Sequence, residues 1–126
     1  MKKILLVFVS LIFASVVSAA GSPYLAAAVN GNKTSSAMSA TPGKAPFFII
    51  YDEKGVYLET VANPYKDEEG AGPMAINMLK EKGIKVFAAE NFPGERFKGF
   101  LKSKGVSPAV FKGTADNAAK SLIKKK

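Results

Sequence analysis

The second half of the chain alternates between helical and strand-like patterns, and this alternation restricts the fold more than any other feature. Apolar residues recur at helical spacing in three segments, 73–82, 95–104 and 114–123. Short apolar runs at 85–89 and 107–111 separate these segments. Strands that are joined through helices run parallel with right-handed crossovers. The pattern therefore predicts a parallel sheet in this half of the chain.

The first half predicts antiparallel pairing instead. An apolar run at 24–29 precedes a long polar segment, 32–46, and a loop of this length in a compact domain is usually functional or disordered. Two further apolar runs, 47–51 and 56–61, flank the turn at 52–55 and indicate a hairpin. We therefore expect a three-layer α/β domain with a mixed five-stranded sheet.

The N-terminus has the pattern of an export signal. Lys2 and Lys3 precede an apolar run at 4–17, and small residues follow where a signal peptidase cleaves. The run is shorter than the roughly 20 residues that a membrane span needs. We predict a cleaved signal peptide at 1–20, a single domain at 21–126, and an exported bacterial protein, periplasmic or secreted, without stable membrane insertion. An uncleaved N-terminal anchor is the alternative.

Composition excludes several kinds of chemistry. The chain contains neither cysteine nor histidine, so disulfide scaffolds, thiol nucleophiles, imidazole bases and the usual zinc ligands are absent. We therefore expect a protein that is not an enzyme. The formal charge of +8 falls by two without Lys2 and Lys3, and a positive charge favours anionic partners such as acidic proteins or metal clusters. The charge is also ordinary for a small soluble domain.

Several motifs in a fixed order resemble one known family. The segment GKAPFFIIYD at 43–52 is followed by VANP at 61–64, GAGPM at 70–74, GIKV at 83–86 and KSKGVS at 102–107. Together they are similar to the dinitrogenase iron–molybdenum cofactor biosynthesis domain family, which includes nitrogenase accessory proteins. The resemblance implies a ribonuclease-H-like α/β fold and a non-catalytic role in binding and transferring an anionic metal–sulfur cluster, such as an iron–molybdenum cluster.

Ligands of α/β sheets bind beyond the carboxyl ends of parallel strands, where the loops at 30–46, 70–73 and 90–94 should meet. Glycines at the start of a helix let backbone amides approach an anion, and Lys44 would neutralise part of its charge. No catalytic or metal-ligating residue is assigned. The candidate cofactor-binding residues are Asn30, Gly31, Lys44, Gly70, Gly72, Met74, Asn91 and Gly94. The structural alternative is that the glycines and Pro73 only form a tight turn.

Three other interpretations remain open. The thioethers of Met38, Met74 and Met78 could bind Cu(I), although methionine also fills gaps in cores. A nuclease would need converging carboxylates, which the scattered acidic residues do not indicate, so no nucleic-acid partner is expected. The runner-up function is a ligand-free interaction module that docks an acidic protein through a basic helix face, although such a face is often only solvated. Its residues would be Arg96, Lys98, Lys102 and Lys104.

Overall fold

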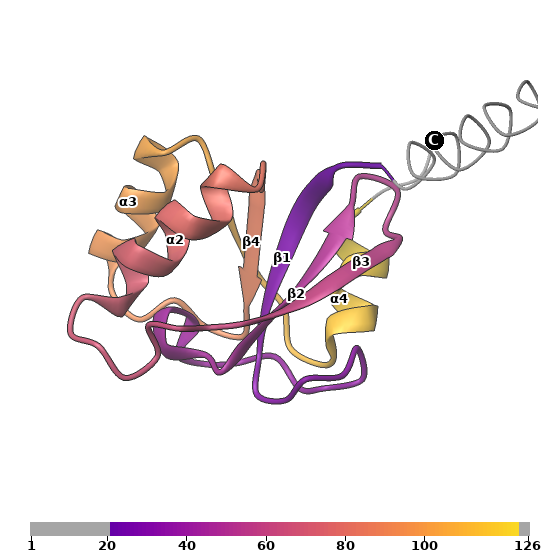
Figure 1. Cartoon of the computed structure of the whole chain (residues 1–126), viewed down its shortest axis with the longest axis horizontal. Helices are drawn as coiled ribbons and strands as arrows, with labels where there is room; N and C mark the ends of the chain where they lie inside the picture. The colour runs from indigo at the N-terminus through magenta and orange to yellow at the C-terminus, as the bar shows by residue number, and fades with distance from the viewer. Residues whose placement is uncertain (1–20, 124–126) are drawn as a thin grey trace, which may run out of the picture.

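The computed structural model describes residues 21–123, which form a mixed five-stranded sheet with helices on both faces (Figure 1). The strand order is β3-β2-β1-β4-β5, with β2 antiparallel to β1 and β3, and β4 parallel to β1 and β5. The strands are β1 (Pro23–Val29), β2 (Phe47–Asp52), β3 (Tyr57–Ala62), β4 (Val86–Ala89) and β5 (Ser107–Val110). The predicted α/β class and mixed five-stranded sheet are confirmed. The predicted signal peptide, 1–20, and residues 124–126 lie outside the described residues.

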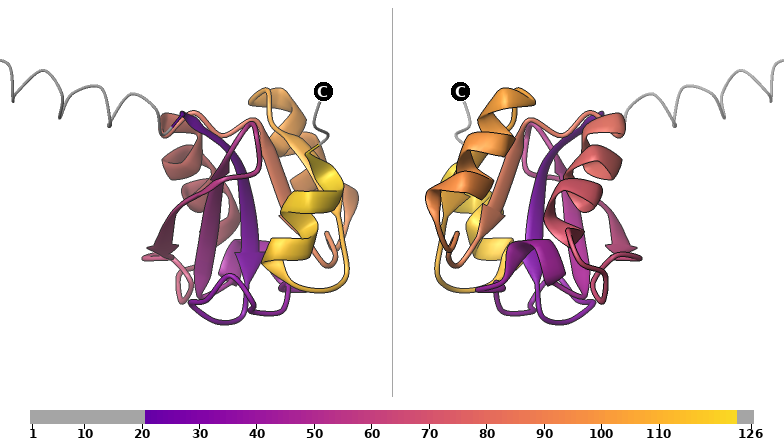
Figure 2. Two further views of the ribbon diagram at one scale, coloured as in Figure 1. Left: turned by 90° about the vertical axis from the view of Figure 1, so that its right-hand side faces the viewer. Right: turned by 90° about the vertical axis from the view of Figure 1, so that its left-hand side faces the viewer.

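The helices cover the two faces unequally. Helices α2 (Ala71–Glu81) and α3 (Glu95–Ser103) lie on one face, and α4 (Ala115–Leu122) covers the other (Figure 2). A single turn of 3-10 helix, η1 (Pro42–Lys44), lies in the long loop between β1 and β2. Within residues 21–123, no helix has both the length and the apolar character needed to cross a bilayer.

The central strand β1 is buried on both faces, which explains its nearly continuous apolar sequence. Successive side chains of a strand point to opposite faces. Ala26 and Ala28 accordingly pack beneath α2 and α3, whereas Leu25, Ala27 and Val29 pack against α4. The sheet thus separates two cores, and the carboxyl end of β1 lies at the edge from which the long loop departs.

Helix α2 begins slightly earlier than the sequence predicts. Its first residue is Ala71, two positions before Pro73, and Gly70 precedes it in a left-handed conformation with φ of 72°. Pro73 is accommodated because the N–H groups of a first helical turn have no intrahelical acceptor, so its missing N–H costs nothing there. Pro108 lies in β5, which is the last strand of the sheet, where a residue without an N–H is tolerated.

Hydrogen bonds join the loop at 30–46 both to the neighbouring strands and to the start of α4. Short bridges join Val29 to Met38 and Ala37 to Thr114, which links the loop to the start of α4. The N–H of Ser39 donates to the carbonyl of Ala28 at 2.8 Å, and its carbonyl accepts from the N–H of Glu90 at 2.8 Å. The loop therefore passes across the carboxyl ends of β1 and β4 and continues to η1.

The ends of the described chain lie away from these loops. The start of β1 and the end of α4 lie at one end of the strands, and the long loop with η1 lies at the opposite end (Figure 2).

Candidate functional site

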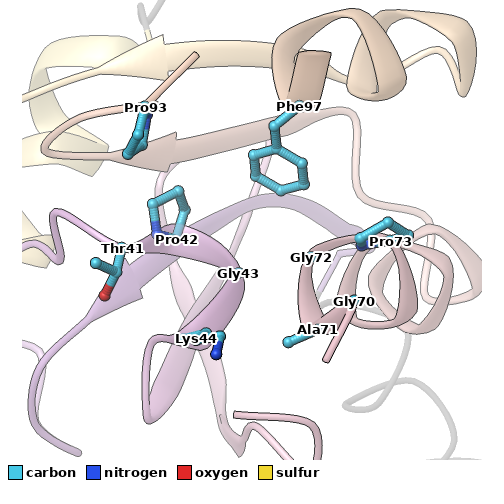
Figure 3. Close-up of a pocket in the computed structure, with 10 residues that line it drawn as sticks. All are labelled: Thr41, Pro42, Gly43, Lys44, Gly70, Ala71, Gly72, Pro73, Pro93 and Phe97. Atoms are coloured by element: carbon cyan, nitrogen blue, oxygen red, sulfur yellow. The ribbon is translucent and has the colours of Figure 1, made fainter. Parts of the chain in front are cut away.

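The three loops predicted to converge do meet, and they enclose a pocket of about 330 Å³ (Figure 3). One wall is residues 41–44, which include η1, and a second wall is residues 70–73 at the start of α2. Pro93 and Phe97, before and within the first turn of α3, form the third wall. The pocket therefore lies where the loops leave the carboxyl edge of the sheet, as expected for an α/β fold.

Close backbone contact between two walls explains the glycines. A Cβ atom on Gly43 would lie 2.7 Å from the Cα of Gly72 and 3.0 Å from its nitrogen. A Cβ atom on Gly72 would lie 2.8 Å from Cε1 of Phe97, and Gly70 has the positive φ that favours glycine. Packing and backbone geometry thus account for all three glycines, so the glycine pattern alone does not indicate a ligand.

The start of α2, which lines the pocket, has backbone donors without a partner in the described part of the chain. The N–H groups of Ala71 and Gly72 have no acceptor among residues 21–123, and Gly70, at the N-cap, has no side chain to cap the helix. Helix α4 differs, because Thr114 Oγ1 accepts a hydrogen bond from the N–H of Asn117 at 3.3 Å. The start of α2 therefore presents free donors at the positive end of the helix dipole.

Lys44 contributes the single charged side chain of the pocket lining. It is exposed, and it forms no ion pair with any residue from 21 to 123. The rings of Pro42, Pro73 and Pro93 make most of the remaining lining apolar. One cation, free N–H donors and apolar walls together suit a small anion that gives up its water easily.

Aromatic packing fixes the wall opposite η1. The ring of Phe97 meets Phe87 edge-on, with centroids 6.2 Å apart, and lies 6.1 Å from the ring of Phe92. Phe87 and Phe92 are buried in the core beneath α2 and α3. Phe97 therefore has little freedom to move, and the pocket is preformed on this side.

The structure brings together Lys44, Gly70 and Gly72 from the predicted set and places the others outside the pocket lining. Asn30 donates from Nδ2 to the carbonyl of Met38 at 3.4 Å, and Gly31 packs against the side chain of Ser36. Both belong to the part of the loop that is bonded toward α4.

Met74, Asn91 and Gly94 also lie outside the lining. Met74 is 39% exposed on α2, although helical spacing places it on the core face. Asn91 and Gly94 flank Pro93, so their turn contributes to the pocket through the proline alone. Phe97 was not among the predicted site residues, and its position in the first turn of the helix that follows the 90–94 loop is the signal that could have placed it there.

The hypothesis that Met38, Met74 and Met78 together form a copper site is wrong. Met38 is buried in the core beneath α4, whereas Met78 packs on the opposite face of the sheet beneath α2. No group of three or more histidine, cysteine or acidic side chains within residues 21–123 could hold a metal ion. On the basic face of α3, Lys98 pairs with Glu95 at 3.0 Å, which lowers the free charge of that face.

The fold and the pocket define a small α/β domain with a mostly apolar site. One cationic side chain and the backbone at the start of a helix line this site. Residues 24–125 match the family described as "Dinitrogenase iron-molybdenum cofactor", and the chain belongs to this family. The family indicates a role in binding or biosynthesis related to the iron–molybdenum cofactor. No curated protein matches the chain.

Several solved structures are similar to this chain, among them the following two. The NMR structure of a NifB-like protein from Thermotoga, assigned to the DUF35 family, has 31% sequence identity and a TM-score of 0.63. The alignment covers 80% of this chain and 85% of that one. The apo form of the orange protein from Desulfovibrio gigas has 20% identity and a TM-score of 0.70, with coverage of 81% and 87%. The second likeness concerns the fold alone.

Proposed function

We propose that this chain is an exported, non-catalytic carrier that holds an anionic metal–sulfur cluster or oxyanion as cargo between η1 and the start of α2. Membership in the iron–molybdenum cofactor family supports the class of cargo. The observation that carries the proposal is that Ala71 and Gly72, whose N–H groups have no acceptor among residues 21–123, line the same pocket as Lys44.

The residues fit a cargo held through its outer sulfur or oxygen atoms. Backbone N–H groups can donate to such atoms, and an anion at a helix N-terminus gains about 0.3–1 kcal/mol, more where water is partly excluded. Lys44 adds an attraction that is stronger beside the apolar walls than in open water. The pocket volume of about 330 Å³ is at the small end of the range for ligand sites.

The side chains of the pocket lining support a role in carrying rather than converting the cargo. Lys44 is the one titratable group in the pocket lining, so no acid and base face each other there. The chain also lacks histidine and cysteine. General acid–base catalysis uses a positioned side chain that takes or gives a proton, and Lys44 is the single candidate in this lining.

Export rests on the N-terminal sequence. Lys2 and Lys3, the apolar run and the small residues before Gly21 form a signal pattern. Cell fractionation with N-terminal sequencing of the native protein tests this part. A mature chain that begins near Gly21 outside the cytoplasm is the expected result, and an intact Met1 in the cytoplasm would refute export.

Binding is tested by titrating the purified protein with tetrathiomolybdate and with molybdate while absorbance and calorimetry are followed. Replacement of Lys44 by glutamate reverses the charge in the pocket, so we expect the affinity to fall at least about tenfold. Lys112 is also exposed but lies outside the lining, and Lys112→Glu is the matched control with unchanged affinity.

Metal analysis of the protein purified from its native compartment complements the titration. Bound molybdenum or iron with a charge-transfer band supports the carrier. Colourless, metal-free protein that binds neither anion would refute it and favour the interaction module with the basic helix face.

A further inference from the structure

Asn63 is a buried residue that binds the η1 turn from outside the pocket. It is 4% exposed and lies directly after β3. Its Nδ2 donates to the carbonyl of Gly43 at 3.1 Å and to the carbonyl of Ala45 at 2.9 Å. Its backbone N–H donates to the carbonyl of Pro46 at 2.9 Å. These three hydrogen bonds from Asn63 thus hold the backbone on both sides of Lys44.

The same side chain also fixes the segment that leads to α2. Asn63 Oδ1 accepts a hydrogen bond from the N–H of Tyr65 at 2.9 Å, and Tyr65 packs against the core beneath α2. One amide therefore bonds both to the η1 turn and to the start of the loop that ends at Gly70. The η1 turn and the end of this loop, from Gly70 onward, both line the pocket.

The chemistry of the position requires an amide. The two hydrogens on Nδ2 serve two different carbonyls, and Oδ1 serves as an acceptor at the same time. An aspartate of the same shape cannot donate and would place a carboxylate oxygen beside two carbonyl oxygens. Buried groups left unpaired in this way are costly.

Other hydrogen bonds hold the start of the η1 turn: the N–H of Thr41 donates to Ser39 Oγ at 3.0 Å, and the hydroxyl groups of Ser39 and Thr41 lie 3.3 Å apart. The turn has an internal bond from the N–H of Lys44 to the carbonyl of Thr41 at 3.0 Å and a long one, 3.5 Å, from Ala45 to Pro42. Its backbone nevertheless rests directly against that of Gly72. The bonds from Asn63 are the hydrogen bonds that hold the carbonyls on either side of Lys44, so they contribute to the position of Lys44 relative to the start of α2.

We propose that Asn63 is the positioning residue of the pocket: it does not touch the cargo but holds Lys44 and the start of α2 at the separation that binds it. This inference rests on the proposed anion-binding function. The role of Asn63 in ordering the turn can nevertheless be measured without any cargo.

The test compares Asn63→Asp with Tyr51→Phe. Tyr51 donates a hydrogen bond to Asp116 on the opposite face of the sheet, so its loss destabilises the protein away from the pocket. We measure amide hydrogen exchange at Lys44 and Ala45, and tetrathiomolybdate affinity, at temperatures equally far below each melting point. Asn63→Ala, which removes the donors without adding charge, replaces Asn63→Asp if the latter does not fold.

The expected result is specific to the Asn63 variant. Exchange at the two amides should accelerate at least about tenfold and affinity should fall about tenfold or more, because two bonds that order the turn are lost. In Tyr51→Phe, the exchange rates at Lys44 and Ala45 and the tetrathiomolybdate affinity should each change by less than about twofold. Equal effects in both variants, or normal affinity in Asn63→Asp, would overturn the inference.

Failure of the inference is distinguishable from failure of the proposed function. If the wild-type protein binds neither tetrathiomolybdate nor molybdate, the carrier function fails and the exchange rates alone judge Asn63. Faster exchange at Lys44 and Ala45 then supports its role in ordering the turn, and unchanged exchange refutes it. If the wild type binds and Lys44→Glu does not, but Asn63→Asp binds normally, the carrier stands and the positioning role falls.

Discussion

Replacement of Gly43 by alanine should destabilise the protein, because this glycine lies where two backbone segments touch. The added Cβ would meet the Cα of Gly72 at 2.7 Å and its nitrogen at 3.0 Å. Both atoms belong to the backbone at the start of α2, so no side chain can rotate away to relieve the overlap. Either the η1 turn or the helix start must shift by several tenths of an ångström.

The size of the effect follows from two opposing contributions. Overpacking by a methyl group in a tight site costs about 1–3 kcal/mol. Alanine also reduces the conformational entropy of the unfolded chain, which offsets about 0.4–1 kcal/mol of this cost. We therefore expect a net loss of about 1–2 kcal/mol, and a loss of 1 kcal/mol lowers the melting temperature of a domain of 60–100 residues by about 4–8 °C.

Gly99→Ala provides the matched control. Gly99 lies in the middle of α3, and a Cβ there would have no neighbour within 4 Å. Alanine should therefore stabilise the helix by about 0.5–1 kcal/mol. Thermal and urea unfolding, followed by circular dichroism, measure both variants. A Gly43→Ala protein as stable as the wild type would show that η1 does not contact α2 as described, and the pocket walls would be wrong.

Two further predictions concern the face of the sheet that α4 covers. Tyr51→Phe removes the hydroxyl that donates a hydrogen bond to Asp116 Oδ1 at 3.0 Å. The free energy of unfolding at neutral pH should fall by about 1 kcal/mol. An unchanged melting temperature would show that this bond contributes nothing to stability. Burial and then the bond to Asp116 raise the pKa of Tyr51 above its ordinary value, so its contribution to stability is complete below about pH 10 and declines as the pH rises further. Alkaline unfolding of Tyr51→Phe should therefore depend less on pH in this range than that of the wild type. Thr114→Ala removes the cap of α4 and should cost about 1 kcal/mol, whereas Thr114→Ser keeps the hydroxyl acceptor and most of the stability.

The fold was largely predictable because its elements have local sequence patterns. The two-faced burial of β1 produces a continuous apolar run, and the helices α2, α3 and α4 have apolar residues at helical spacing. The start of α2 was misplaced because Pro73 fits any position of a first turn. Met74 was predicted to bind the cofactor, but it lies on α2 outside the pocket lining and is exposed.

The site was predictable only in part, because long-range contacts leave no periodic pattern. Gly70 and Gly72 were visible as a turn and Lys44 as an isolated cation, and all three line the pocket. Asn63 lies 20 residues from Gly43, and nothing local in the sequence indicates their hydrogen bond. Phe97 has the spacing of a core residue, and only the convergence of the loops shows that its ring also forms a wall.

The location of the chain ends has a practical consequence. The start of β1 and the end of α4 lie at the end of the sheet opposite the long loop with η1 (Figure 2). A linker joined before Gly21 or after Ile123 could therefore attach the domain to a sensor chip, a bead or a fusion partner with the pocket directed toward solvent. Immobilised protein of this kind would capture cargo from solution without steric interference from its own support.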